Sequence, residues 1–68
     1  MNFIIETEQE EDGRWIAEVL ELPSVLAYGQ TPEQARAKAQ ALALRMVAEQ
    51  LERGKIASDL VSVSFAAA

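Results

Sequence analysis

The sequence predicts an α+β domain in which a small antiparallel sheet packs on one long helix, in the order β-β-β-α-β. Three short segments alternate between polar and apolar residues and are separated by turn residues: 2–9, 14–21 and 25–29. A segment with helical periodicity then runs from Pro32 to about Arg53, and alternation returns over 60–65. The 68 residues contain no linker or repeat, so we interpret 1–68 as a single domain.

The first two strands are joined by a hairpin turn over 10–13. Asp12-Gly13 is the signal for that turn, because glycine readily adopts the positive φ that tight hairpins need. Residues at every second position share a face of a strand. We expect one face to meet the helix, with Phe3, Ile5, Trp15, Ala17 and Val19. The opposite face then carries Ile4, Glu6, Glu8, Ile16, Glu18 and Leu20.

A turn at 22–24 separates the second strand from a short third one. Pro23 has no N–H to give to a sheet ladder, which favours a turn there. In the third strand, Leu26 and Tyr28 fall on the face that points away from the helix. Together with Ile4, Ile16 and Leu20 they predict an exposed apolar patch, which in a small protein is typical of a subunit or partner interface.

The start of the helix is the best-defined point of the chain. Gly29 gives the backbone freedom to turn, and Thr31 is a good N-cap because its hydroxyl accepts from amides of the first turn. Pro32 suits the first helical position, and Gln34 completes a capping box with Thr31. Gly54 suits the position just after the helix.

The helix is expected to lie on the sheet through one apolar face, formed by Ala35, Ala39, Leu42, Ala43, Met46 and Val47. A second apolar group lies around its side: Leu44, Ala48 and Leu51. The helix is longer than the strands, so its far end needs cover. The segment 60–65 places Val61, Val63 and Phe65 on one face. It either adds a strand to the same sheet or pairs with a neighbouring chain, and 66–68 is expected to fray.

Composition excludes several kinds of chemistry. The chain has no cysteine or histidine, which removes disulfides, thiolate or imidazole metal sites and the usual activated nucleophiles. We therefore expect no cofactor, no metal and no enzymatic activity. A core of this size is usually helped by association, so we expect a homo-oligomer, a dimer or tetramer. We find no signal peptide and no membrane span, and expect a cytoplasmic protein.

Charge is unevenly distributed around the net value of −5. Residues 1–30 carry seven acids and one arginine, a net of −6, whereas 31–68 carry four acids and five bases, a net of +1. An acidic sheet argues against nucleic-acid binding, which needs a basic surface. It either serves only to keep the protein soluble or suits a basic protein partner. The candidate partner-binding residues are Glu6, Glu8, Glu18, Leu20, Glu21, Leu26 and Tyr28.

The order of these motifs resembles the HicB-like antitoxin family, the partners of HicA-type toxins. The resemblance rests on Asp12-Gly13 followed by Trp15 and Ala17, on Leu22-Pro23, and on 28–35, Tyr-Gly-Gln-Thr-Pro-Glu-Gln-Ala, opening a long helix. It covers about 3–54. Ser24, Gln30 and Gln34 depart from the residues usual in the family, and the chain lacks the family's DNA-binding C-terminal segment.

The resemblance implies a degraded ribonuclease-H-like core and a stand-alone antitoxin domain that binds and neutralises a small basic ribonuclease toxin. It implies no operator binding, because 55–68 is too short and too weakly basic for a DNA-binding motif. The alternative is an orphan homo-oligomeric scaffold or ligand-binding domain of the same fold, with no toxin partner.

Overall fold

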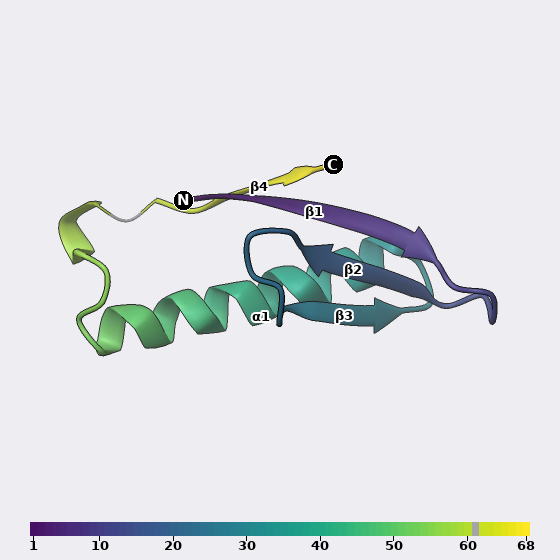
Figure 1. Cartoon of the computed structure of the whole chain (residues 1–68), viewed down its shortest axis with the longest axis horizontal. Helices are drawn as coiled ribbons and strands as arrows, with labels where there is room; N and C mark the ends of the chain where they lie inside the picture. The colour runs from purple at the N-terminus through teal and green to yellow at the C-terminus, as the bar shows by residue number, and fades with distance from the viewer. Residues whose placement is uncertain (61) are drawn as a thin grey trace.

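The computed structural model describes residues 1–60 and 62–68. The elements follow in the order β1 (Asn2–Gln9), β2 (Trp15–Val19), β3 (Leu26–Gly29), α1 (Pro32–Glu52), the short 3₁₀ helix η1 (Ser58–Leu60) and β4 (Ser64–Ala67). One sheet with strand order β3-β2-β1-β4 lies against α1 on one side (Figure 1). The α+β class and the order β-β-β-α-β are therefore confirmed.

The hairpin between β1 and β2 closes with one residue in the left-handed region. Gly13 has φ +91° and donates its N–H to the Glu10 carbonyl at 3.0 Å, while the Glu10 N–H donates to the Arg14 carbonyl at 2.7 Å. Asp12 accepts from the Arg14 N–H at 3.0 Å and from its Nε at 2.7 Å. These hydrogen bonds lower the pKa of the Asp12 carboxyl.

The connection between β2 and β3 is longer than the sequence predicts. β2 ends at Val19 instead of Glu21, and β3 begins at Leu26 instead of Val25. The reason is a turn in which Leu22 donates to the Val19 carbonyl at 3.0 Å and Val25 to the Leu22 carbonyl at 2.8 Å. Val25 is nevertheless buried, and its carbonyl accepts from the Val19 N–H at 3.0 Å.

The start of α1 confirms the N-cap. Thr31 Oγ1 accepts from the Gln34 N–H at 3.0 Å, and Pro32 is the first helical residue. The capping box differs in one bond, because Gln34 Oε1 accepts from the N–H of Gln30 at 2.7 Å instead of that of Thr31. An unpaired amide at the helix entrance is satisfied in either case.

Gly29 serves a purpose that the sequence does not reveal. It is not among the glycines with positive φ, which are Gly13 and Gly54. A Cβ atom at Gly29 would lie 2.6 Å from the Ala35 amide nitrogen and 3.1 Å from the Ala35 Cα. A positive φ is therefore not what requires glycine here: the missing Cβ of Gly29 lets the first turn of α1 approach the end of β3.

The C-terminal end of α1 confirms the role of Gly54. The helix ends at Glu52, and Gly54 follows the cap residue Arg53 with φ +69°. Gly54 donates to the Leu51 carbonyl at 3.0 Å and Lys55 donates to the Gln50 carbonyl at 2.9 Å. This pair of bonds is a Schellman motif, which satisfies the last carbonyls of the helix.

The last strand adds to the sheet of its own chain, which is one of the two expected alternatives. β4 pairs with β1 in parallel, with Phe3 opposite Phe65, so the sheet is mixed and not wholly antiparallel. It spans 64–67 instead of 60–65, Leu60 belongs to η1, and Val61 lies outside the described residues. The expected fraying of 66–68 is wrong, because Ala66 and Ala67 pair with β1 and the Ala68 N–H donates to the Ile5 carbonyl at 2.9 Å.

The core lies between the sheet and α1. It contains the predicted Phe3, Ile5, Ala17 and Val19, with Trp15 half-buried beside them, and from the helix Ala35, Ala39, Ala43 and Val47. The Phe3 and Phe65 rings lie 5.6 Å apart. Leu42 was expected in this core but does not belong to it, because its side chain is 38% exposed. Partly buried side chains from α1 and from the C-terminal segment pack against this core: Met46, Leu51, Ile56, Val63 and Phe65.

Candidate functional site

The side of the sheet that points away from α1, here called the outer face, brings most of the predicted partner-binding residues together. Alternation places seven side chains there: Ile4, Glu6, Glu8, Ile16, Glu18, Leu26 and Tyr28. Leu20, at the end of β2, continues the same alternation. The three strands that supply these residues are adjacent in the sheet, which makes the outer face one continuous surface.

Two glutamates face each other at its centre. Glu6 of β1 is directly opposite Glu18 of β2, and Glu18 is in turn opposite Leu26 of β3. Like charges in opposed positions of an antiparallel pair destabilise it. Both glutamates are exposed, and among the described residues the ion pairs are Asp12–Arg14 and Glu49–Arg53, which involve neither of them. A cation from outside the chain would relieve this repulsion.

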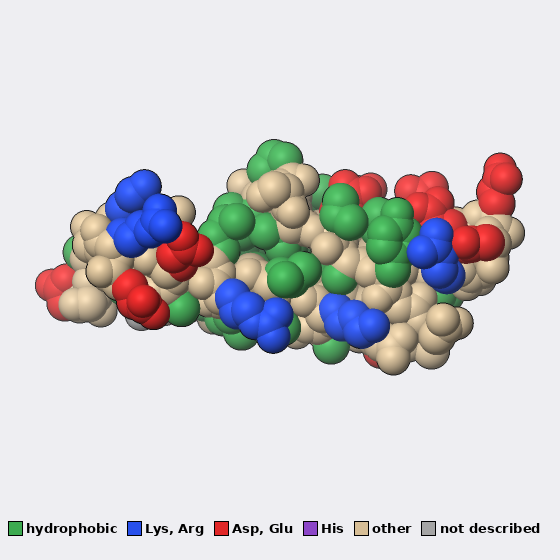
Figure 2. Space-filling view, turned by 90° about the horizontal axis from the view of Figure 1, so that it is seen from below, with side chains coloured by type: hydrophobic (Ala, Val, Ile, Leu, Met, Phe, Trp, Pro, Cys, Tyr) green, Lys and Arg blue, Asp and Glu red, His purple; other side chains and the backbone are tan. Residues whose placement is uncertain are grey.

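Apolar side chains flank the two glutamates. Leu20 is 49% exposed, and Leu26 and Tyr28 are each 39% exposed. Ile16 was expected in the exposed patch, but it is only 9% exposed, since it lies between Glu8 and Tyr28 across the strands. In Figure 2 hydrophobic side chains lie next to acidic ones toward the hairpin end of the molecule. The outer face thus combines negative charge with apolar anchors.

Arg14 is a member of this surface that the sequence did not single out. Its guanidinium carbon lies 4.5 Å from the centre of the Tyr28 ring, and its Nε is held by Asp12. A cation over an aromatic face is attracted by the ring quadrupole, so this contact favours one position of Tyr28. Finding it required the strand register, because fourteen positions separate Arg14 and Tyr28 in the chain.

Glu21 has a structural bond that its exposure alone does not suggest. One carboxylate oxygen accepts from the Ile4 N–H at 2.9 Å, beside the bond from the Leu20 N–H to the Ile4 carbonyl, also 2.9 Å. Its charge remains at the edge of the outer face, but the side chain also continues the β1–β2 ladder beyond Val19. Substituting Glu21 would therefore disturb the fold as well as the surface.

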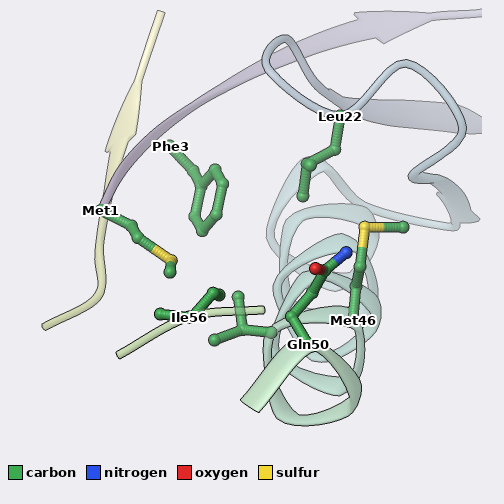
Figure 3. Close-up of a pocket in the computed structure, with 7 residues that line it drawn as sticks. Met1, Phe3, Leu22, Met46, Gln50 and Ile56 are labelled. Atoms are coloured by element: carbon green, nitrogen blue, oxygen red, sulfur yellow. The ribbon is translucent and has the colours of Figure 1, made fainter. Parts of the chain in front are cut away.

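A cavity lies on the other side of the sheet, near the far end of α1. Its volume is about 220 Å³, and its lining is almost entirely apolar (Figure 3): Met1, Phe3, Leu22, Met46, Val47, Gln50 and Ile56. Gln50 supplies an amide, and none of the described side chains that line the cavity is titratable. The described lining side chains are therefore suited to apolar contact.

Over residues 1–60 and 62–68, no group of three or more acidic, cysteine or histidine side chains is close enough to hold a metal ion. In the same part of the chain, no helix has both the length and the apolar character of a membrane span. No protein-family model matches the chain, and neither a curated protein nor a solved structure matches it.

Proposed function

We propose that this chain is a HicB-type antitoxin-like protein, cytoplasmic and without catalytic activity of its own. It binds a small basic ribonuclease toxin through the outer face and neutralises it by covering its RNA-binding surface. The observation that carries the proposal is the opposed pair Glu6 and Glu18, exposed between Leu20, Leu26 and Tyr28. The motif resemblance over 3–54 supports the same assignment.

The physical basis is complementarity of charge and shape. A ribonuclease surface that binds RNA carries lysine and arginine to contact phosphates, so it suits an acidic surface. A basic side chain placed between Glu6 and Glu18 removes their mutual repulsion, while partner side chains bury the exposed apolar groups. Charge speeds the encounter of the two proteins, and the buried aromatic and aliphatic contacts slow their separation.

The test is recovery of the tagged chain from its source cell at low and moderate salt, with the complex mass measured by light scattering. We expect a small basic protein in stoichiometric amount, which salt releases because screening weakens surface electrostatics. The double variant Glu6→Lys/Glu18→Lys should weaken binding by more than about tenfold, mainly in the association rate.

A matched variant, Glu49→Lys/Asp59→Lys, changes the net charge equally but away from the sheet, and it should retain binding. Equal loss in both variants would show that overall charge and not the outer face is responsible. Recovery of this chain alone, at a fixed multiple of 7.5 kDa, would favour the orphan oligomer instead.

A further inference from the structure

Tyr28 is contacted from one side by a short series of polar groups that begins in the hairpin turn. Asp12 accepts two hydrogen bonds from Arg14, one from the backbone N–H at 3.0 Å and one from Nε at 2.7 Å. The guanidinium carbon of Arg14 lies 4.5 Å from the centre of the Tyr28 ring. The contacts therefore lead from the turn, through Arg14, to the aromatic ring.

The strand register explains why Arg14 reaches this ring. Ile16 is directly opposite Tyr28, and Arg14 lies two positions before Ile16, so all three side chains belong to the outer face. Arg14 and Tyr28 are therefore diagonal neighbours across two adjacent strands, and a long side chain can span that separation. Trp15, between Arg14 and Ile16, packs against the core instead.

The turn that carries Asp12 is itself held by hydrogen bonds. The Glu10 N–H donates to the Arg14 carbonyl at 2.7 Å, the Gly13 N–H donates to the Glu10 carbonyl at 3.0 Å, and Gln9 Nε2 donates to the Gly13 carbonyl at 3.2 Å. The hydrogen bonds from Arg14 also lower the pKa of the Asp12 carboxyl, so this group stays ionised and paired with Arg14 at neutral pH. Arg14 is thus anchored on a turn of fixed shape.

We propose that Arg14 is a positioning residue of the outer face: held by Asp12, it fixes the Tyr28 ring in the orientation in which a protein partner contacts it. This inference rests on the proposed function, because it concerns the same partner surface. Tyr28 is 39% exposed, so a fixed ring offers the partner a rigid aromatic anchor. A side chain that is ordered before binding loses less conformational freedom in the complex, which strengthens binding.

Charge alone predicts the opposite effect of Arg14. It is the one basic residue among residues 1–30, so its charge repels a basic partner. If Arg14 acted only through its charge, its removal would speed association and strengthen the complex. If Arg14 positions Tyr28, its removal weakens the complex, mainly by raising the dissociation rate. The sign of the change in affinity therefore separates the two roles.

Binding of the partner is measured first. The probe is the small basic protein recovered with the tagged chain, and its dissociation constant is compared between the unchanged chain and Arg14→Gln. We expect the constant to rise by about twofold to fivefold, the range for one exposed cation–π contact. The rise should disappear in the Tyr28→Leu background, because Arg14 acts through that ring. Tighter binding of Arg14→Gln, or an equal rise in both backgrounds, would overturn the proposal.

Arg53→Gln is the matched control. It removes the same charge together with an exposed ion pair, the one from Arg53 to Glu49 at 2.7 Å, but it lies beyond the end of α1 and away from the outer face. It should leave the dissociation constant unchanged. A rise as large as that of Arg14→Gln would show that overall charge, and not the position of Tyr28, is responsible.

Proton NMR of the chain without a partner tests the contact itself. An aromatic ring moves the signals of protons above its face upfield, so the Arg14 Hδ signals should lie upfield of those in Tyr28→Leu. Asp12→Asn should reduce this displacement, because Arg14 Nε loses its charged acceptor. Undisplaced signals in a chain that still binds its partner would refute the positioning role and leave the proposed function standing. Displaced signals with no partner recovered would refute the proposed function instead, and the positioning role with it.

Discussion

Replacing Gly29 by alanine tests the close approach of α1 to β3. The added Cβ atom would lie 2.6 Å from the Ala35 amide nitrogen, whereas ordinary contact begins at 3.4 Å. The two backbones would have to separate by about 0.8 Å at this point, and both neighbouring atoms belong to the main chain, which cannot rotate away. Ala35 is fully buried, so the shift opens the core beneath the first helical turn.

The magnitude follows from three contributions. Overpacking of a tight contact costs about 1–3 kcal/mol, and disturbance of the Thr31 cap adds about 1 kcal/mol. Loss of glycine's freedom in the unfolded chain returns about 0.4–1 kcal/mol. The net loss is about 1–3.5 kcal/mol, with a central value of about 2 kcal/mol. A domain of this length has a total stability of about 3–10 kcal/mol, so the variant loses a large share of it.

Urea unfolding at a fixed protein concentration measures this loss. With a slope of about 1 kcal/mol per molar urea, the midpoint should fall by about 2 M. Gly54→Ala is the control: it has the same unfolded-state term and nothing within 4 Å of its new Cβ, but its φ of +69° should cost about 1 kcal/mol. If Gly29→Ala costs no more than Gly54→Ala, the close approach is not what requires glycine.

Two further predictions concern the hairpin and the last strand. The hydrogen bonds from Arg14 lower the pKa of the Asp12 carboxyl. The ionised carboxylate therefore contributes its full stabilisation above pH 3.8, the ordinary pKa of the group, and this stabilisation is lost as the pH falls through the lower pKa of the folded state. Asp12→Asn should therefore make the free energy of unfolding, measured in urea, less dependent on pH in that acidic range, and an unchanged pH dependence would contradict this role of Asp12. Deleting 66–68 should lower the free energy of unfolding by about 1–2 kcal/mol, because it removes ladder hydrogen bonds to β1. A neutral deletion would mean that the segment frays in solution.

Local signals in the sequence determined the helix, its caps and the first hairpin. Each of these features depends on residues only a few positions apart, as in the bond between Thr31 and Gln34 or the turn at Gly13. Alternation likewise determined which side chains share a face of each strand, and so placed Glu6, Glu18, Leu26 and Tyr28 on the outer face. The resulting class, α+β with one helix on a small sheet, required no long-range information.

The tertiary structure decided how these elements meet. The parallel placement of β4 beside β1 joins segments about sixty positions apart, and no local motif specifies such a pairing. The same holds for the Arg14–Tyr28 contact and the bond from Ile4 to Glu21. Gly29 shows the difference most clearly: the sequence marked it as a glycine at a turn, but only the packing of α1 on β3 shows that a Cβ has no room there. Local patterns specify what each segment becomes, whereas the space left between segments is set by all of them together.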